Sequence, residues 1–294
     1  MTKGTWYAVG AYVMWGLFPV YWKWLHQVPA IQLISHRIIW SCLLLIVVIL
    51  VTRQVKNFRE IALVSSILPI YIIAALLIGV NWLMYVWGVN SGYILETSLG
   101  YFINPLISIL LGVIFLHERL RRGQWIAIGL AALGVLYLTF AYGRPPWIAL
   151  ALAVTFGLYG LVKKTAPLGS LYGLTLETAL LFLPALLFLT YNEIVGQGAF
   201  LHLGTRIDIL LVGAGLVTTV PLLFFATAVQ HTPLSMMGFL QYISPTMQFL
   251  LGALVYRESF TAAQLVGFGL VWTALIIFGI EGMLNRRRQA AVVA

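Results

Sequence analysis

Two stretches of this chain share one pattern: YFINPLISILLGVIFLHERL at residues 101–120 and QYISPTMQFLLGALVYRESF at residues 241–260. They align with an offset of 140 residues, which matches Pro105 with Pro245 and Glu118 with Glu258. Each unit of this internal repeat is long enough for five membrane spans of about 20 residues. Because five is an odd number, the second unit is predicted to cross the membrane in the opposite sense to the first.

The composition is that of a polytopic membrane protein. Of the 294 residues, 62% are apolar and 9% are charged, and the mean hydropathy is +0.99. A soluble protein carries about 25% charged residues and could not bury so many apolar side chains. This excludes a cytosolic enzyme, a disordered chain and a secreted disulfide scaffold. The single Cys42 and scattered histidines predict no metal or cofactor, and the sparse charges predict no nucleic-acid partner.

The apolar runs predict an all-α membrane protein with ten transmembrane helices arranged as two inverted five-helix repeats. Residues 1–142 form the first repeat, and residues 143–294 form the second with its basic tail. Of the 17 Lys and Arg residues, twelve fall on the side that holds both chain ends, so both termini are predicted to be cytoplasmic. The segment 61–92 is also compatible with a re-entrant pair. The expected helices cover residues 5–24, 30–52, 66–89, 94–116, 124–142, 146–163, 171–190, 207–229, 234–256 and 262–283.

Several motifs resemble the EamA repeat of the drug/metabolite transporter superfamily, and more narrowly its RarD subgroup. The resemblance covers residues 5–282. It implies a permease of the bacterial inner membrane and favours export of an amphipathic metabolite or drug, but it leaves the substrate open. The motifs are His117-Glu118-Arg119-Leu120 with Gln124 and Gly129, Arg257-Glu258-Ser259-Phe260 with Gln264 and Gly269, Ser35-His36-Arg37, Gly92 to Pro105, and Leu174-Thr175-Leu176-Glu177-Thr178.

Arg37 and Glu177 are charged residues inside predicted spans, at matching positions of the two units. An arginine at the bilayer centre costs about 2.5–3.5 kcal/mol on insertion scales, so Arg37 should face the bundle or a wet cavity. The two residues are predicted to act in transport, and one arrangement open to them is a pair across the repeat interface; the alternative is a static pair that locks the halves together. His36 lies next to Arg37. Because an unperturbed imidazole titrates near neutral pH, His36 is a candidate proton relay, and the alternative is a packing residue.

Polar stripes flank Pro105 and Pro245, which are expected to kink their helices and free a backbone carbonyl. Such groups need a partner or cavity water, so the stripes are predicted to line an aqueous path. Close helix packing is the alternative. The candidate residues for a substrate cavity or for coupling are Trp15, His36, Arg37, Asn81, Tyr85, Glu96, Tyr101, Asn104, Tyr159, Glu177, Gln241 and Ser244.

The predicted function is a secondary carrier that moves a small solute by alternating access, driven by the solute gradient or by protons coupled through His36 or Glu177. No ATP-binding loop is present in the sequence. A membrane-embedded enzyme, a receptor and an assembly partner are the alternatives, and the oligomeric state stays open.

Overall fold

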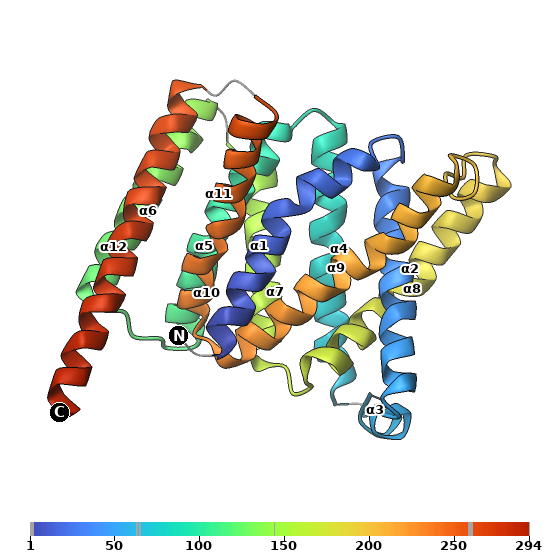
Figure 1. The fold of residues 1–294 in the computed structure, drawn as a ribbon, viewed down its shortest axis with the longest axis horizontal. Coiled ribbons are helices and arrows are strands. Elements are labelled where there is room, and N and C mark those ends of the chain that lie inside the picture. Colours follow the sequence, from blue (N-terminus) through green and yellow to red (C-terminus); the bar gives the residue numbers. More distant parts are fainter. Residues whose placement is uncertain (1–2, 63, 65, 144, 258–260, 294) are drawn as a thin grey trace.

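The computed structural model describes residues 3–62, 64, 66–143, 145–257 and 261–293, and this part of the chain is helical throughout, with no strand (Figure 1). The predicted all-helical fold is therefore confirmed for the described residues. The elements are α1 (Lys3–Trp24), α2 (Ala30–Val51), α3 (Val55–Ala62), α4 (Leu68–Asn90), α5 (Ile94–Phe115), α6 (Arg122–Tyr142), α7 (Trp147–Thr165), α8 (Ser170–Ile194), α9 (Thr205–His231), α10 (Leu234–Gln241), α11 (Ile243–Leu250), the π-helix η1 (Leu251–Val255) and α12 (Ala262–Val293).

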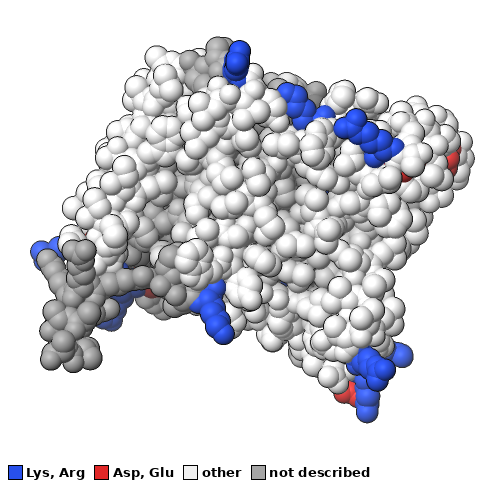
Figure 2. Space-filling view, in the orientation of Figure 1, with Lys and Arg blue, Asp and Glu red and all other residues white. Residues whose placement is uncertain are grey.

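Eight of these helices are long and apolar enough to cross a membrane: α2, α4, α5, α6, α7, α8, α9 and α12. Their outer faces carry large apolar side chains, such as Phe140 and Leu216, which are 79% and 55% exposed. In Figure 2 the middle of the visible face is almost free of charge, and the Lys and Arg side chains gather along two opposite edges. An apolar belt between charged edges fits a lipid bilayer.

Two helical runs outside these eight depart from the predicted pattern. Helix α1 is not among the eight because its tyrosines, tryptophans and glycines lower its mean hydropathy. The predicted single helix 234–256 is divided into α10, α11 and η1, with the break at Tyr242. Pro245 has no amide hydrogen, so the carbonyl of Gln241 loses its helical partner near this break. In contrast, α5 continues unbroken through Pro105.

The segment between α2 and α4 holds the short helix α3, which was expected to be a loop. Its Lys56 and Glu60 side chains are 87% and 63% exposed. After it, α4 runs as one helix, so the re-entrant pair that the sequence also allowed for 61–92 is not found in the described part of that segment. The last helix, α12, continues well past the predicted end at 283.

The helices pack mainly as neighbours that are distant in sequence. Helix α6 contacts α12 along the edge of the molecule, α5 contacts α7 and α10, and α2 contacts α8 and α9 (Figure 1). Helix α1 contacts α9 and α11, and α4 contacts α7 and α8. This arrangement brings the polar faces of α1, α2, α4, α5, α9 and α11 together in the interior.

Candidate functional site

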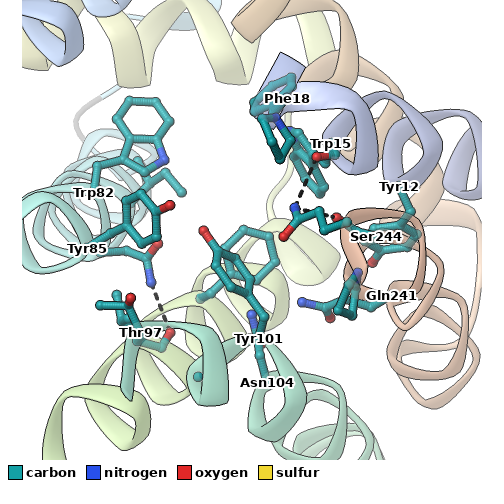
Figure 3. A pocket seen from close by; sticks show the side chains of 18 of the residues that line it. Tyr12, Trp15, Phe18, Trp82, Tyr85, Thr97, Tyr101, Asn104, Gln241 and Ser244 are labelled. Carbon is teal, nitrogen blue, oxygen red and sulfur yellow. Dashed lines mark hydrogen bonds between the residues drawn. The ribbon is translucent and has the colours of Figure 1, made fainter. Parts of the chain in front are cut away.

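A cavity of about 270 Å³ lies in the interior, among helices from both halves of the chain (Figure 3). Its lining residues follow helical spacing, because residues three or four apart share one face of a helix. They come from α1 (Tyr12, Trp15, Phe18, Pro19, Trp22), α2 (Arg37), α4 (Ile78, Asn81, Trp82, Tyr85), α5 (Thr97, Gly100, Tyr101, Asn104), α7 (Leu152, Phe156), α9 (Thr218, Leu222), α10 (Gln241) and α11 (Ser244, Pro245, Gln248).

Most of the candidate residues lie on this cavity. In Figure 3, Trp82 and Tyr85 face it from one side, Trp15 and Phe18 from the other, and Tyr101 projects between them. The predicted residues that line it are Trp15, Arg37, Asn81, Tyr85, Tyr101, Asn104, Gln241 and Ser244, together with Pro245.

Hydrogen bonds fix some of the lining side chains and leave others without a partner. The Asn81 amide donates to the carbonyl oxygen of Leu152 at 2.9 Å and to Thr155 Oγ1 at 2.9 Å, which ties α4 to α7. In contrast, the buried Tyr12 hydroxyl and the buried Asn104 Oδ1 have no hydrogen-bond partner in the described structure. Buried polar atoms are normally satisfied, so these two atoms are available to water or a ligand.

Among the described residues that line this cavity, Arg37 is the one that carries a charge. Its Nε donates to Thr218 Oγ1 at 2.9 Å, and its guanidinium carbon lies 4.8 Å from the ring centroid of Trp22 and 4.9 Å from that of Trp82. Cation–π contacts of this kind stabilise a guanidinium away from bulk water by about 0.5–2 kcal/mol. The predicted pairing of Arg37 with Glu177 is wrong, because each residue has other partners.

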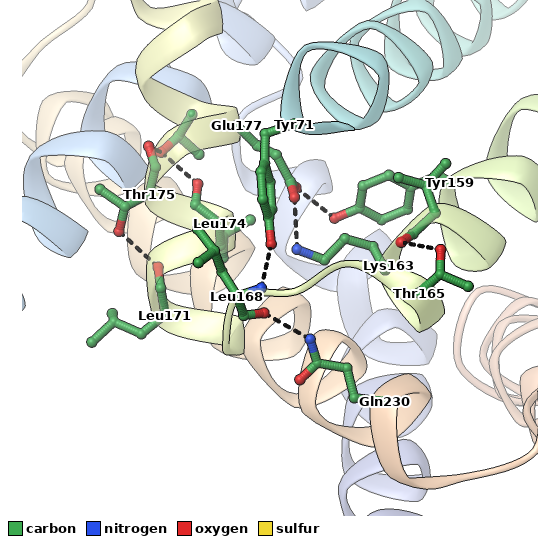
Figure 4. A network of polar contacts seen from close by, with 12 residues as sticks. Tyr71, Tyr159, Lys163, Thr165, Leu168, Leu171, Leu174, Thr175, Glu177 and Gln230 are labelled. Atoms are coloured by element: carbon green, nitrogen blue, oxygen red, sulfur yellow. Dashed lines mark hydrogen bonds and ion pairs between the residues drawn. The ribbon is translucent and has the colours of Figure 1, made fainter. Parts of the chain in front are cut away.

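Glu177 lies in a separate polar network near the end of α7 (Figure 4). Its Oε1 accepts a hydrogen bond from Lys163 Nζ at 2.6 Å, and its Oε2 accepts one from the Tyr159 hydroxyl at 2.9 Å. Beside them, the Tyr71 hydroxyl accepts a hydrogen bond from the amide of Leu168 at 2.9 Å. The predicted candidates Tyr159 and Glu177 are thus brought together, but away from the cavity.

Two further candidates do not line the cavity. His36 packs against Phe200 with 5.3 Å between ring centroids, on the side of α2 that faces the loop after α8. Glu96 accepts a hydrogen bond from the amide of Ile148 at 2.7 Å and from the Tyr142 hydroxyl at 2.9 Å. Glu96 therefore satisfies an amide in the first turn of α7, where helix amides lack internal acceptors.

A second cavity of about 650 Å³ adjoins the first. The two cavities share Pro19, Tyr101, Pro245 and Gln248. The second one reaches Lys23 in the last turn of α1, and Lys23 Nζ lies 3.7 Å from the ring centroid of Tyr256. The two cavities therefore share part of their lining, and the second one extends to the last turn of α1 and to Phe249 in α11.

Several residues of these sites lie outside the predicted set. Trp22, near the end of its span, is predicted to lie at the membrane interface, and Trp82 is the neighbour of the predicted Asn81 in the sequence. Thr218 carries no distinguishing sequence signal. Lys163 counts among the basic residues that predict the topology, but the sequence also places it in register with Tyr159 on one face of α7. Among the described residues, no three His, Cys, Asp or Glu side chains come together as metal ligands would.

Comparison with known proteins agrees with this architecture. The model of the EamA-like transporter family matches residues 2–140 and again residues 145–280. Protein RarD of Streptomyces exfoliatus is 44% identical over 98% of this chain and 91% of its own length. The uncharacterized transporter YojE of Bacillus subtilis is 44% identical over 94% and 93%, and protein RarD of Escherichia coli is 40% identical over 98% and 97%. A crystal structure with 17% identity has the same fold, with a TM-score of 0.69 over 94% of this chain and 97% of that one.

Proposed function

Since this chain belongs to the EamA-like transporter family and is a RarD-type protein, we propose that it is a permease of the bacterial inner membrane that moves a small organic solute by alternating access. The observation that carries this proposal is the polar and aromatic cavity in the interior of an otherwise apolar helical bundle. Its volume of about 270 Å³ lies just below the range of about 300–1,000 Å³ that is common for small-molecule sites.

The carrier is proposed to consist of two five-helix units, residues 1–142 and 143–294, with inverted orientation. In this scheme each main helix of the first unit has a counterpart in the second. The pairs are α1 with α7, α2 with α8, α4 with α9, α5 with the α10–α11–η1 run, and α6 with α12. The contacts between the main helices of the two units support it, because each of these contacts has its exchanged counterpart. The contact of α1 with α9 is matched by that of α7 with α4, and the contact of α2 with α9 by that of α8 with α4.

Local geometry repeats with the same offset of 140 residues as the sequence. His117 and Arg257 both have a left-handed backbone with φ of 53° at the ends of the corresponding helices. The next helices also begin alike, since the Gln124 and Gln264 side chains each accept a backbone hydrogen bond at 2.9 Å, from Arg121 and Thr261. The matched Glu258 lies outside the described residues.

The proposed topology, with both termini in the cytoplasm, determines which side of the membrane the cavities face. The second cavity reaches Lys23 and Tyr256, which then belong to the outer side of the membrane. At the opposite end, the side chains of the Lys163–Glu177 pair are buried, and neither of these two cavities includes them. We therefore assign this structure to the outward-facing state of the transport cycle. In the inward-facing state, the Lys163–Glu177 network separates and the outer ends of α1 and α11 approach.

The energy source is proposed to be the gradient of the solute, or protons coupled through Glu177. Of the two residues that the sequence suggested for a proton step, Glu177 takes part in the contact that closes the inner end. His36 packs on Phe200 instead and does not line the cavity.

Flux measurements with purified protein in proteoliposomes test the carrier proposal. A panel of labelled small metabolites is followed with and without a pH gradient, and protein-free liposomes serve as the blank. Uptake or release that depends on the protein is the expected result. Chemical conversion of a solute without flux would replace the carrier with an enzyme, and the absence of both would favour a receptor or assembly partner. The variant Lys56→Gln, altered at an exposed surface residue, should transport like the unmodified protein.

A further inference from the structure

We propose that the cavity takes a small planar organic anion, whose carboxylate binds the Arg37 guanidinium. This inference rests on the proposed carrier function and deepens it by naming the class of solute.

The first argument is the charge of the lined space. Among the described residues that line the two cavities, the charged ones are Arg37 and Lys23, and neither Asp nor Glu is present. A charge removed from water is costly unless another charge or strong hydrogen bonds compensate it. The cavity therefore holds positive charge that the protein itself does not neutralise.

The second argument is the number of donors that Arg37 leaves available. A guanidinium has five N–H donors, and in the described structure only Nε has a protein acceptor, Thr218 Oγ1. The rings of Trp22 and Trp82 flank the cation without accepting its in-plane hydrogens. The remaining N–H groups suit a carboxylate, which binds a guanidinium through two parallel hydrogen bonds.

The third argument comes from the internal repeat. Lys163 and Glu177 form a buried ion pair in the second unit. The position 140 residues before Glu177 holds Arg37, and the residue of α1 that aligns with Lys163, at the offset of 141 that matches Trp6 with Trp147, is Trp22. The first unit therefore has a cation in place of the carboxylate, and an aromatic ring that contacts this cation in place of the lysine. A solute carboxylate bound at Arg37 would supply the missing negative charge.

The other residues that line the cavity indicate the chemistry of the solute beyond its carboxylate. Aromatic rings from Trp15, Tyr85, Tyr101 and Phe156 surround the space, which favours a flat apolar body. The Asn104 amide oxygen is buried and lacks a partner, so it can accept a hydrogen bond from the solute. In the first cavity the guanidinium of Arg37 balances one negative charge, which favours a carboxylate there over a doubly charged phosphate. A solute ammonium would find no acidic residue among the described lining residues.

Three probes of nearly equal shape test this inference: indole-3-acetate, indole-3-acetamide and tryptamine, which differ mainly in charge. Binding to the purified full-length protein is measured by titration calorimetry in detergent. We expect the carboxylate to bind at least about tenfold more tightly than the amide, since buried charge-assisted contacts to a guanidinium are strong. Tryptamine should not bind. Arg37→Gln should weaken binding of the carboxylate by about tenfold or more, and Lys56→Gln should leave it unchanged.

Equal binding of the acid and the amide, or binding of neither, would overturn the inference, and so would full carboxylate affinity in Arg37→Gln. If Arg37→Gln fails to fold, the comparison of acid with amide on the unmodified protein still decides. Failure of the carrier proposal looks different. Carboxylate binding without flux in proteoliposomes would contradict only the proposal that the protein is a carrier. Flux of an uncharged solute that is unchanged in Arg37→Gln would contradict only the proposal that the solute is an anion.

Discussion

Lys163 and Glu177 form an ion pair with 2.6 Å between Nζ and Oε1, and their side chains are 0% and 1% exposed. The lysine extends from the last turn of α7, and the glutamate lies in the second turn of α8. The pair therefore joins two helices at the end of the bundle that the cavities do not reach. In the proposed carrier, this contact would stabilise one state, because opening that end would separate two charges.

The first prediction concerns the stability of this pair. Glu177→Gln leaves the Lys163 ammonium buried without its counter-charge, and breaking a buried pair in this way costs about 3–5 kcal/mol. The double variant Lys163→Met/Glu177→Leu removes both charges and should recover most of the loss. Thermal unfolding in detergent measures both, with Lys56→Gln as the exposed control. A single variant as stable as the unmodified protein would show that the pair contributes nothing.

The second prediction separates Arg37 from Glu177. Arg37 bonds to Thr218 and Glu177 bonds to Lys163, so the two share no partner. The unfolding free energies of Arg37→Ala and Glu177→Gln should therefore add within about 0.5 kcal/mol in the double variant. The same cycle on Lys163 and Glu177 should be strongly non-additive. Coupling between Arg37 and Glu177 in this double-mutant cycle would restore the pairing that the sequence suggested.

The contrast between these residues shows what the sequence could and could not predict. Asn104 was predictable because a polar stripe on an apolar helix must face a partner or a cavity, and it lines the cavity. The partner of Glu177 was not predictable in the same way. Lys163 stands where basic residues normally mark the cytoplasmic end of a span. That its side chain turns inward depends on how α7 and α8 pack, and no local pattern encodes that packing.

Glu96 illustrates the same limit within a single stripe. It follows the spacing that places Asn104 on the cavity, but its carboxylate caps the first turn of α7. The sequence shows which face of α5 is polar. That the first turn of α7 lies beside this face depends on how the helices pack in the folded chain. The break at Tyr242 was equally hard to place, because Pro105 and Pro245 occupy matching positions and only the second lies next to a break.

The third prediction concerns Glu118, which caps a helix of the other unit. Its carboxylate accepts hydrogen bonds from the amides of Leu234 at 2.6 Å and Ser235 at 2.8 Å, and from the Ser235 hydroxyl at 2.5 Å. Glu118→Ala should lower the free energy of unfolding by about 2 kcal/mol, at the upper end of helix-cap losses. Solute affinity should be unchanged, because Glu118 does not line either cavity. Glu60→Ala, which changes an exposed carboxylate, is the matched control.

The fourth prediction tests the direction in which the cavities face. The chain has one cysteine, Cys42, which is buried, so Cys42→Ala gives a background for single introduced cysteines. Gln248 borders both cavities, and Gln248→Cys should react with a membrane-impermeant thiol reagent added outside intact cells. Thr175 lies in α8 near the Lys163–Glu177 pair and is 1% exposed, so Thr175→Cys should not react from that side.

The labelling pattern follows from the proposed topology and from the buried pair that blocks the inner end. Tags at the two chain ends provide an independent check, and both should be accessible only after the cytoplasmic side is exposed. Replacing the pair in Lys163→Met/Glu177→Leu should lower labelling at Gln248→Cys from outside, because loss of the inner contact shifts the population toward the inward-facing state. Labelling of Gln248→Cys only from the cytoplasmic side would reverse the orientation, and unchanged labelling in the double variant would remove the ion pair from the transport cycle.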